Sequence, residues 1–326
     1  MFQLTNNQTA RIVDELKPFD VAPGTIERFR LHLVTDGIGQ SVYVPVLIAR
    51  GREGDKIFGC TAAVHGDELN GIPVIQRLFQ QIDPESLHGI LVGVPIVNVP
   101  SLLKLKRRFI DGIDLNHIMP GKSNGNISEV YAFRIVNNII RHFDYLVDIH
   151  TASFGRVNSY YVRADMHQPR TAEMARLQNA QIIVHNPPED GTLRGAAENL
   201  GIPAITLEVG DPYTFQRNMI HSGRTGIHNL LNYLGFTNDL IESPKTAPVM
   251  CERSYWMYTD TGGILRVHHN LVDRVSAGEI IADHFNIFGD LIRQYRAPED
   301  GIIIGKSTNP ICPTGGRILH LGIVEK

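Results

Sequence analysis

The turn that holds His65 and Glu68 is the feature that most constrains how this chain can fold. It follows an apolar run from Ile57 to Val64, which predicts a buried strand, and it precedes apolar residues that recur with helical period over 72–79. A strand that leads through a polar turn into a helix is typical of α/β proteins. Open α/β sheets bind their ligands outside the carboxyl ends of the strands, and His65 and Glu68 lie at such an end.

An imidazole and a carboxylate at this spacing can bind one divalent cation from the turn. Zinc accepts a mixture of nitrogen and oxygen ligands, and a catalytic zinc uses three protein ligands and one open position. The pair alone is weak evidence, because the chain contains 14 histidines and 34 acidic residues. Taken alone, a helix start with Asp67 and Glu68 at the positive end of the helix dipole is the more economical interpretation.

Further segments predict the remainder of the same sheet. Alternating residues in 29–33 and 41–48, separated by glycines, predict a hairpin at a sheet edge. Apolar runs at 89–98, 145–149 and 202–210 predict interior strands. A helix over 128–140, with Ser128 as its expected cap, separates two of them. This alternation predicts an α/β fold with a mixed, mainly parallel sheet flanked by helices.

Two of these strands end in side chains that can carry chemistry. His150 closes the strand at 145–149, as His65 closes the earlier one, and is therefore the third candidate ligand. Asp148 points to the same side of the strand and could orient the imidazole. In isolation, His150 is equally well explained as a buried histidine at a strand end. Glu208 lies among Leu, Val and Gly, where a carboxylate is either paired with a cation or catalytic.

The composition changes at 243–248, where serine and proline predict a linker. Beyond it, short alternating segments are separated by glycines, which is typical of a small all-β domain. We therefore expect a catalytic domain over 1–245 and a β-rich domain over 246–326. The β-rich domain is expected to act as a lid or an oligomerisation module.

The composition also argues against several classes of protein. With a net charge of −3 and no basic tract, the chain is not expected to bind nucleic acid or an anionic membrane. It has no apolar run of membrane-spanning length, and residues 1–7 show no secretory signal. Its three cysteines lack the spacing of a metal site or a disulfide framework. We therefore expect a cytoplasmic protein that acts on a small molecule, and a homo-oligomer is left open.

Four stretches together resemble the succinylglutamate desuccinylase/aspartoacylase family, whose members have a zinc carboxypeptidase-like fold. These stretches are His65–Gly71, Arg108–Asn116, Asp148–His150 and Pro203–Gly210. The resemblance covers most of the chain, and the segment 297–301 is similar to part of the barrel-sandwich β domain that many bacterial members carry.

The resemblance implies a zinc-dependent amidohydrolase that removes an acyl group from the nitrogen of a small amino acid or amine. It implies one zinc ion per chain, with the ligands His65, Glu68 and His150. Glu208 matches the general base of the family, and Arg108 matches the residue that polarises the scissile carbonyl. Asn116 matches part of the clamp for a substrate carboxylate.

One departure concerns substrate specificity. The family clamp continues with arginine, whereas Asn116 is followed here by His117. Arginine offers a permanently charged fork of donors, while histidine is often neutral at pH 7 and lacks the fork. One interpretation is a substrate unlike N-acetylaspartate or N-succinylglutamate, with Arg156 or Arg163 as a relocated anchor. The other is that His117 does not contact the substrate.

Two alternatives to a deacylase remain at this point. A metallocarboxypeptidase acting on short peptides is disfavoured, because the arginine expected for a peptide carboxylate is missing at position 117. A non-catalytic binding protein on the same fold is hard to reconcile with the retention of all three ligands, of Glu208 and of Arg108.

Overall fold

The computed structural model describes residues 10–189, 191–244 and 246–325. Residues 1–7, considered above for a secretory signal, and residue 245, at the expected domain boundary, lie outside the described residues. The strands of the first 209 residues are β1 (Arg11–Val13), β2 (Thr25–Thr35), β3 (Ser41–Arg50), β4 (Glu53–Ala62), β5 (His88–Val94), β6 (Tyr145–His150), β7 (Arg156–Asn158), β8 (Tyr160–Ala164), β9 (Ile182–His185) and β10 (Ala204–Val209). The α-helices are α1 (Gly71–Gln81), α2 (Val99–Leu102), α3 (Ile127–Asn138), α4 (Pro169–Arg176), α5 (Leu193–Asn199) and α6 (Arg217–Tyr233).

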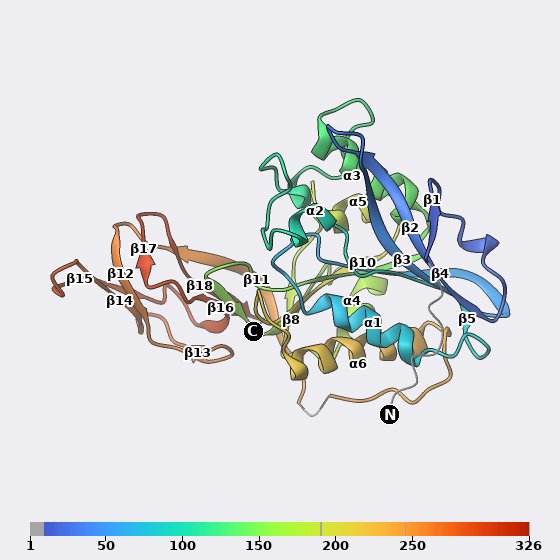
Figure 1. The fold of residues 1–326 in the computed structure, drawn as a ribbon. Coiled ribbons are helices and arrows are strands. Elements are labelled where there is room, and N and C mark those ends of the chain that lie inside the picture. Colours follow the sequence, from blue (N-terminus) through green and yellow to red (C-terminus); the bar gives the residue numbers. More distant parts are fainter. Residues whose placement is uncertain (1–9, 190, 245, 326) are drawn as a thin grey trace, which may run out of the picture.

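One large mixed sheet organises the molecule (Figure 1). Its centre has the order β5-β4-β6-β10, and these four strands run parallel. Antiparallel pairs flank this centre, namely β2 with β3 and β3 with β5 on one side and β10 with β8 on the other. The predicted hairpin is present, and β1 lies outside it, parallel to β2. The predicted α/β fold with a mixed sheet is confirmed.

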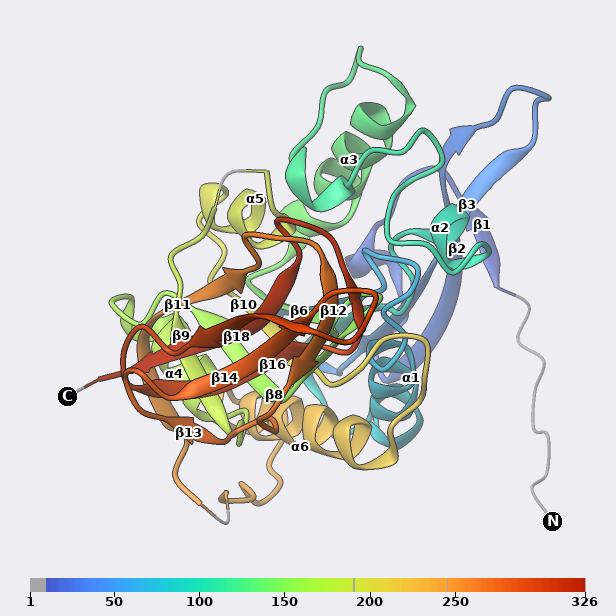
Figure 2. The same cartoon turned by 90° about the vertical axis from the view of Figure 1, so that its left-hand side faces the viewer.

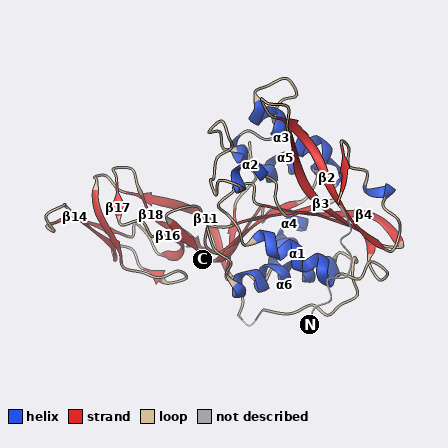
Figure 3. Cartoon of the chain, in the orientation of Figure 1, coloured by secondary structure: helices blue, strands red, loops and turns tan. Residues whose placement is uncertain are grey.

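Helices cover both faces of the sheet (Figure 3). On one face, Leu78 of α1, Met174 of α4 and Leu230 of α6 belong to one buried apolar cluster. On the other face, Ile135 of α3 and Ala196 of α5 belong to a second cluster. Burial on both faces explains why the central strands are continuously apolar in sequence. None of the described helices is long and apolar enough to span a membrane.

Helix α3 begins earlier than expected. Its N-cap is Asn126, whose side chain accepts from the amide of Glu129 while Glu129 accepts from the amide of Asn126. This reciprocal capping box provides partners for two amides at the helix start. The expectation that Ser128 caps the helix was therefore wrong, and Ser128 instead donates to Asp111.

The C-terminal part is all β, as predicted. Its strands are β11 (Val249–Tyr258), β12 (Gly263–Val267), β13 (Arg274–Val275), β14 (Ile280–Phe285), β15 (Leu291–Arg296), β16 (Gly301–Ser307), β17 (Ile311–Cys312) and β18 (Arg317–Val324). Strands β12, β14, β15 and β17 form a separate four-stranded sheet. Its residues Leu265 and Ile281 share a buried core with Leu319 of β18, so that two sheets pack face to face. In Figure 1 these orange and red strands extend to the left of the α/β part, and Figure 2 shows them from the front.

The C-terminal part also continues the large sheet. Strand β11 pairs in parallel with β9, β18 pairs with β11, and β16 pairs with both β18 and β7. The chain therefore leaves the α/β part and returns to its sheet edge. This arrangement brings residues of β11 and β18 beside the carboxyl ends of β6 and β10.

Candidate metal centre and substrate cavity

His65 and Glu68 lie in the turn between β4 and α1. The side chain of Asn98 donates to the carbonyl of Val64, and the amide of Gly66 donates to the carbonyl of Lys106. A Cβ atom at Gly66 would lie 2.2 Å from the carbonyl carbon of Ser101, so only glycine permits this close backbone approach. The turn is thereby held against the segment that carries Arg107 and Asp114.

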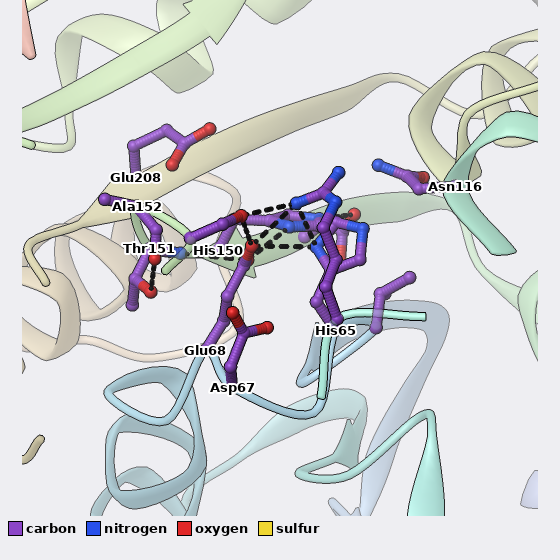
Figure 4. A network of polar contacts seen from close by, with 12 residues as sticks. His65, Asp67, Glu68, Asn116, His150, Thr151, Ala152 and Glu208 are labelled. Carbon is purple, nitrogen blue, oxygen red and sulfur yellow. Dashed lines mark hydrogen bonds and ion pairs between the residues drawn. The ribbon is translucent and has the colours of Figure 1, made fainter. Parts of the chain in front are cut away.

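The three predicted ligands converge on one point. His65 Nδ1 and His150 Nδ1 each lie 2.9 Å from an oxygen of the Glu68 carboxylate, at Oε1 and Oε2 respectively. The three ligand atoms lie within 4.8 Å of one another, and the side chains are at most 5% exposed. Figure 4 shows the three side chains pointing toward one another. The structure therefore brings together all three residues that the sequence singled out.

A carboxylate orients each imidazole from its other side. Asp148 Oδ2 lies 2.7 Å from Nε2 of His150, and Asp114 Oδ1 lies 3.1 Å from Nε2 of His65. An ionised carboxylate only accepts hydrogen bonds, so each Nε2 atom donates its proton to its carboxylate partner. The two Nδ1 atoms face Glu68, and they are the nitrogens that a metal ion would meet. The role expected for Asp148 as an orienting carboxylate agrees with this contact. Asp114 lies in the stretch Arg108–Asn116, and the sequence had suggested no role for it.

This donor set fits a divalent cation such as zinc. Two imidazole nitrogens and a carboxylate meet at one buried point, and carboxylates hold the imidazoles as they do at known metal sites. The electrostatics agree. Burial opposes a charge on His150, but Asp148 and Glu68 outweigh it and raise the pKa of His150 well above its ordinary value. Burial likewise opposes the charge of Glu68, yet His65 and His150 hold its pKa well below its ordinary value. The cluster therefore stabilises added positive charge.

A second group of potential ligands is a weaker candidate for a metal site. Asp165, His167 and His185 also lie within 4.8 Å of one another, but His167 is exposed. The Nδ1 atom of His185 already accepts from the amide of Met166 at 3.1 Å. That nitrogen would lose its partner on binding a metal ion, so His65, Glu68 and His150 are the stronger candidate for a metal centre.

Glu208 lies at the carboxyl end of β10, beside the cluster (Figure 4). Its Cα is the register partner of His150 in the parallel pair of β10 and β6. Asn158 donates to its Oε2 at 3.1 Å, and Arg163 Nε lies 3.6 Å from its Oε1. Burial raises the pKa of Glu208, and Arg163 opposes this effect only in part. A raised pKa suits a carboxylate that exchanges protons near neutral pH.

Arg107, and not Arg108, extends into the cluster. Its guanidinium donates to Glu68 at 3.1 Å, to Ser153 at 2.6 Å and to Asp114 at 2.8 Å. Arg108 is exposed and donates to the carbonyl of Gly112 at 3.2 Å. The structure thus does not place Arg108 at the site. Its neighbour Arg107 occupies the place at the cluster that was expected for Arg108.

The predicted substrate-binding residues line one cavity of about 380 Å³ together with the metal cluster. Asn116 Oδ1 accepts from the amide of Leu193 at 2.7 Å, which leaves its amide nitrogen as a donor. His117 is exposed at the cavity wall, and Arg156 is half-buried in it. Arg163, the other residue considered as a relocated anchor, also lines the cavity.

The C-terminal strands form one wall of this cavity. Their lining residues include Trp256 of β11 and Arg317 and His320 of β18. Sequence reasoning missed all three, because nothing local in the sequence indicates that β11 and β18 rejoin the large sheet. The β-rich part, expected to be a lid or an oligomerisation module, is therefore part of the cavity itself.

Comparisons with known proteins agree with this geometry. A model of the succinylglutamate desuccinylase/aspartoacylase catalytic domain matches residues 59–234. N-alpha-acetyl-L-2,4-diaminobutyric acid deacetylase of Halomonas elongata is 25% identical over 281 residues, which are 82% of this chain and 81% of that protein. Succinylglutamate desuccinylase of Pseudomonas paraeruginosa is 26% identical over 208 residues, 60% of this chain and 61% of that protein. The latter match spans less than two thirds of the relative.

Solved structures share the fold over nearly the whole chain. A succinylglutamate desuccinylase from Silicibacter sp. TM1040 superposes with a TM-score of 0.84 at 21% identity, covering 94% of this chain and 98% of that one. The product-bound ectoine utilization protein EutE from Ruegeria pomeroyi gives a TM-score of 0.84 at 20% identity, covering 93% and 98%. The matched segment 59–234 is more than half of the chain and contains the candidate ligands and Glu208. The chain therefore belongs to the succinylglutamate desuccinylase/aspartoacylase family.

Proposed function

We propose that this protein is a zinc-dependent amidohydrolase that removes an acyl group from a small N-acylated amino acid or amine. The named relatives are a deacetylase and a desuccinylase of N-acylated amino acids, which supports hydrolysis of a linear amide bond. The observation that carries the proposal is the convergence of His65, Glu68 and His150 in one cavity with Glu208 and Arg107.

His65, Glu68 and His150 would hold the zinc ion. A zinc ion at such a site lowers the pKa of water toward neutrality and polarises a carbonyl. Glu208 then acts as the base. It accepts the proton of the attacking water and transfers it to the departing amine nitrogen, and its raised pKa allows both transfers. Asn158, which donates to Glu208, orients that carboxylate.

Arg107 stabilises the charge that develops on the carbonyl oxygen. A guanidinium is a permanent charge with several donors, and a donor fixed in advance toward a developing oxyanion costs no reorganisation during the reaction. Asp114 and Ser153 hold this guanidinium. The deacylase assignment thus gives Arg107 the role that the sequence had given to Arg108.

The cavity volume of about 380 Å³ suits a small molecule. Asn116 offers its amide nitrogen to a polar group of the substrate, and His117 lies next to it at the wall. This supports an N-acyl amino acid or amine over a long peptide.

The test combines metal analysis with a substrate panel. Purified protein should contain one zinc ion per chain, lose activity when a chelator removes the metal, and regain it with zinc. Release of free amine from N-acetyl and N-succinyl amino acids, N-acyl amines and dipeptides would identify the substrate class. Hydrolysis of dipeptides alone would favour a carboxypeptidase. Zinc-loaded protein that hydrolyses no member of the panel would favour a binding protein.

A further inference from the structure

Five arginines line the cavity, and three of them have partners within it. Arg107 pairs with Glu68 and Asp114, Arg163 bonds to Tyr161 and faces Glu208, and Arg194 donates to Asn186. In the described ranges 10–189, 191–244 and 246–325, neither Arg156 nor Arg317 has an acidic partner or a side-chain hydrogen bond. The cavity therefore holds two cations that form no ion pair with a described carboxylate.

These two arginines share one aromatic ring. The guanidinium carbon of Arg156 lies 5.6 Å from the centroid of the Trp256 ring, and that of Arg317 lies 5.3 Å from it. Trp256 in turn stacks on His320, with 5.1 Å between ring centroids and an interplanar angle of 12°. The indole thus holds two like charges in one place through cation–π contacts.

The surroundings of this cluster favour an anion. Burial, Arg317 and Arg107 lower the pKa of Arg156, and Glu68 and Glu208 offset this only in part. A further negative group in the cavity would therefore stabilise the charge of Arg156. His320 is buried, its Nε2 lies 2.9 Å from Ser254 Oγ, and its Nδ1 has no partner among the described residues. A buried polar atom without a partner is unusual in folded proteins.

We propose that Arg156 and Arg317, held on Trp256, bind a carboxylate group of the substrate. The proposal rests on the proposed function and narrows it to N-acyl compounds that carry an acid group, on either the acyl side or the amine side. A guanidinium matches a carboxylate by two parallel hydrogen bonds, which His117 cannot supply. Arg156 of β7 and Arg317 of β18 therefore provide the forked cation that is missing from position 117, in the cavity that also contains the metal cluster.

Trp256 makes the proposal directly measurable. It is the only tryptophan of the chain, so intrinsic tryptophan fluorescence reports on this cluster alone. The full chain, treated with a chelator so that acids cannot bind through a metal ion, is titrated with succinate, with glutamate and with succinamide. Succinate mimics an acyl-side acid, glutamate an amine-side acid, and succinamide lacks the charge. Calorimetry on the same samples gives an independent Kd.

At least one acid should change the fluorescence saturably, while succinamide should not. Arg156→Gln and Arg317→Gln should each raise the Kd of the acid that binds to wild type about tenfold or more, because a charge-assisted hydrogen-bond pair is lost. Arg317 is exposed, so its variant is expected to fold. Arg266→Gln is the matched control, since Arg266 lies 5.3 Å from the Phe285 ring, outside the cavity, and it should leave Kd unchanged.

Two results would overturn the subsite: wild-type protein that binds neither acid, or an unchanged Kd in both variants. The titration involves no amide bond, so its outcome is independent of turnover. If the protein binds an acid through these arginines but hydrolyses no N-acyl compound, the subsite proposal stands and the proposed function is wrong. If wild type and both variants hydrolyse N-acyl acids with the same kcat/KM, the proposed function stands and the subsite proposal is wrong.

Discussion

Glu208 and His150 are direct register partners across the parallel strands β10 and β6. Ladder hydrogen bonds fix this register, so a slip of one residue in either strand would turn the side chain of that strand away from the cavity. The candidate base and one candidate ligand are thus held together by the centre of the sheet rather than by a loop. This rigidity is what a site with fixed catalytic geometry requires.

The first prediction concerns the metal ligands. His65→Ala and His150→Ala proteins should lose the zinc that wild type retains, because each substitution removes one of three ligands. Elemental analysis of dialysed protein measures this loss. His167→Ala, which removes an exposed histidine of the other group, is the control and should keep its metal. Loss of zinc in that control alone would move the centre to Asp165, His167 and His185.

The second prediction concerns Glu208 as the base. Glu208→Gln should keep its zinc and lose on the order of 10²-fold or more in kcat, since the amide cannot accept the proton. In wild type, kcat/KM should fall at acid pH as Glu208 becomes protonated, because a protonated carboxyl group cannot accept a further proton. A Glu208→Gln enzyme with normal turnover would show that the base lies elsewhere.

The raised pKa of Glu208 also predicts an effect on stability. A folded-state pKa above the ordinary value of 4.5 means that the protonated form stabilises the fold. This contribution is fully present below the unfolded-state pKa and is lost as pH rises through the folded-state pKa. In metal-free protein at pH 7, Glu208→Gln should therefore have a Tm equal to or above that of wild type. A clearly lower Tm would show that the ionised carboxylate stabilises the fold.

The third prediction separates two adjacent arginines. Arg107→Ala should lower kcat/KM by roughly 10²–10³-fold, about 2.7–4 kcal/mol, if it acts like one oxyanion donor. Arg108→Ala is the matched control and should change kcat/KM little, because its side chain is exposed and outside the cavity. Kinetics on zinc-loaded proteins would decide between them, and the reverse pattern would restore Arg108 to the site.

The fourth prediction concerns His117. His117→Arg should lower KM for N-acetylaspartate or N-succinylglutamate more than it raises kcat, because the contact with a carboxylate exists before and during the reaction. Efficient wild-type hydrolysis of N-acetylaspartate, unaffected by the substitution, would show that position 117 does not determine specificity.

The sequence by itself determined the strands and the side chains at their ends. Apolar runs with helical segments between them place His65, His150 and Glu208 at the carboxyl ends of β4, β6 and β10, because parallel strands joined by right-handed crossovers all end at one edge. Covalent order and local periodicity suffice for this inference. Both features are encoded within a few residues of each side chain.

Only the tertiary structure decided which other residues complete the site. Arg107 and Arg108 are adjacent in an irregular loop, where no periodicity shows which side chain turns inward. The contact of Asp114 with His65 joins segments that are far apart in sequence. Trp256 and Arg317 reach the cavity because β11 pairs with β9 and β18 with β11. Strand pairing between distant segments depends on the packing of the whole sheet, which local sequence patterns do not contain.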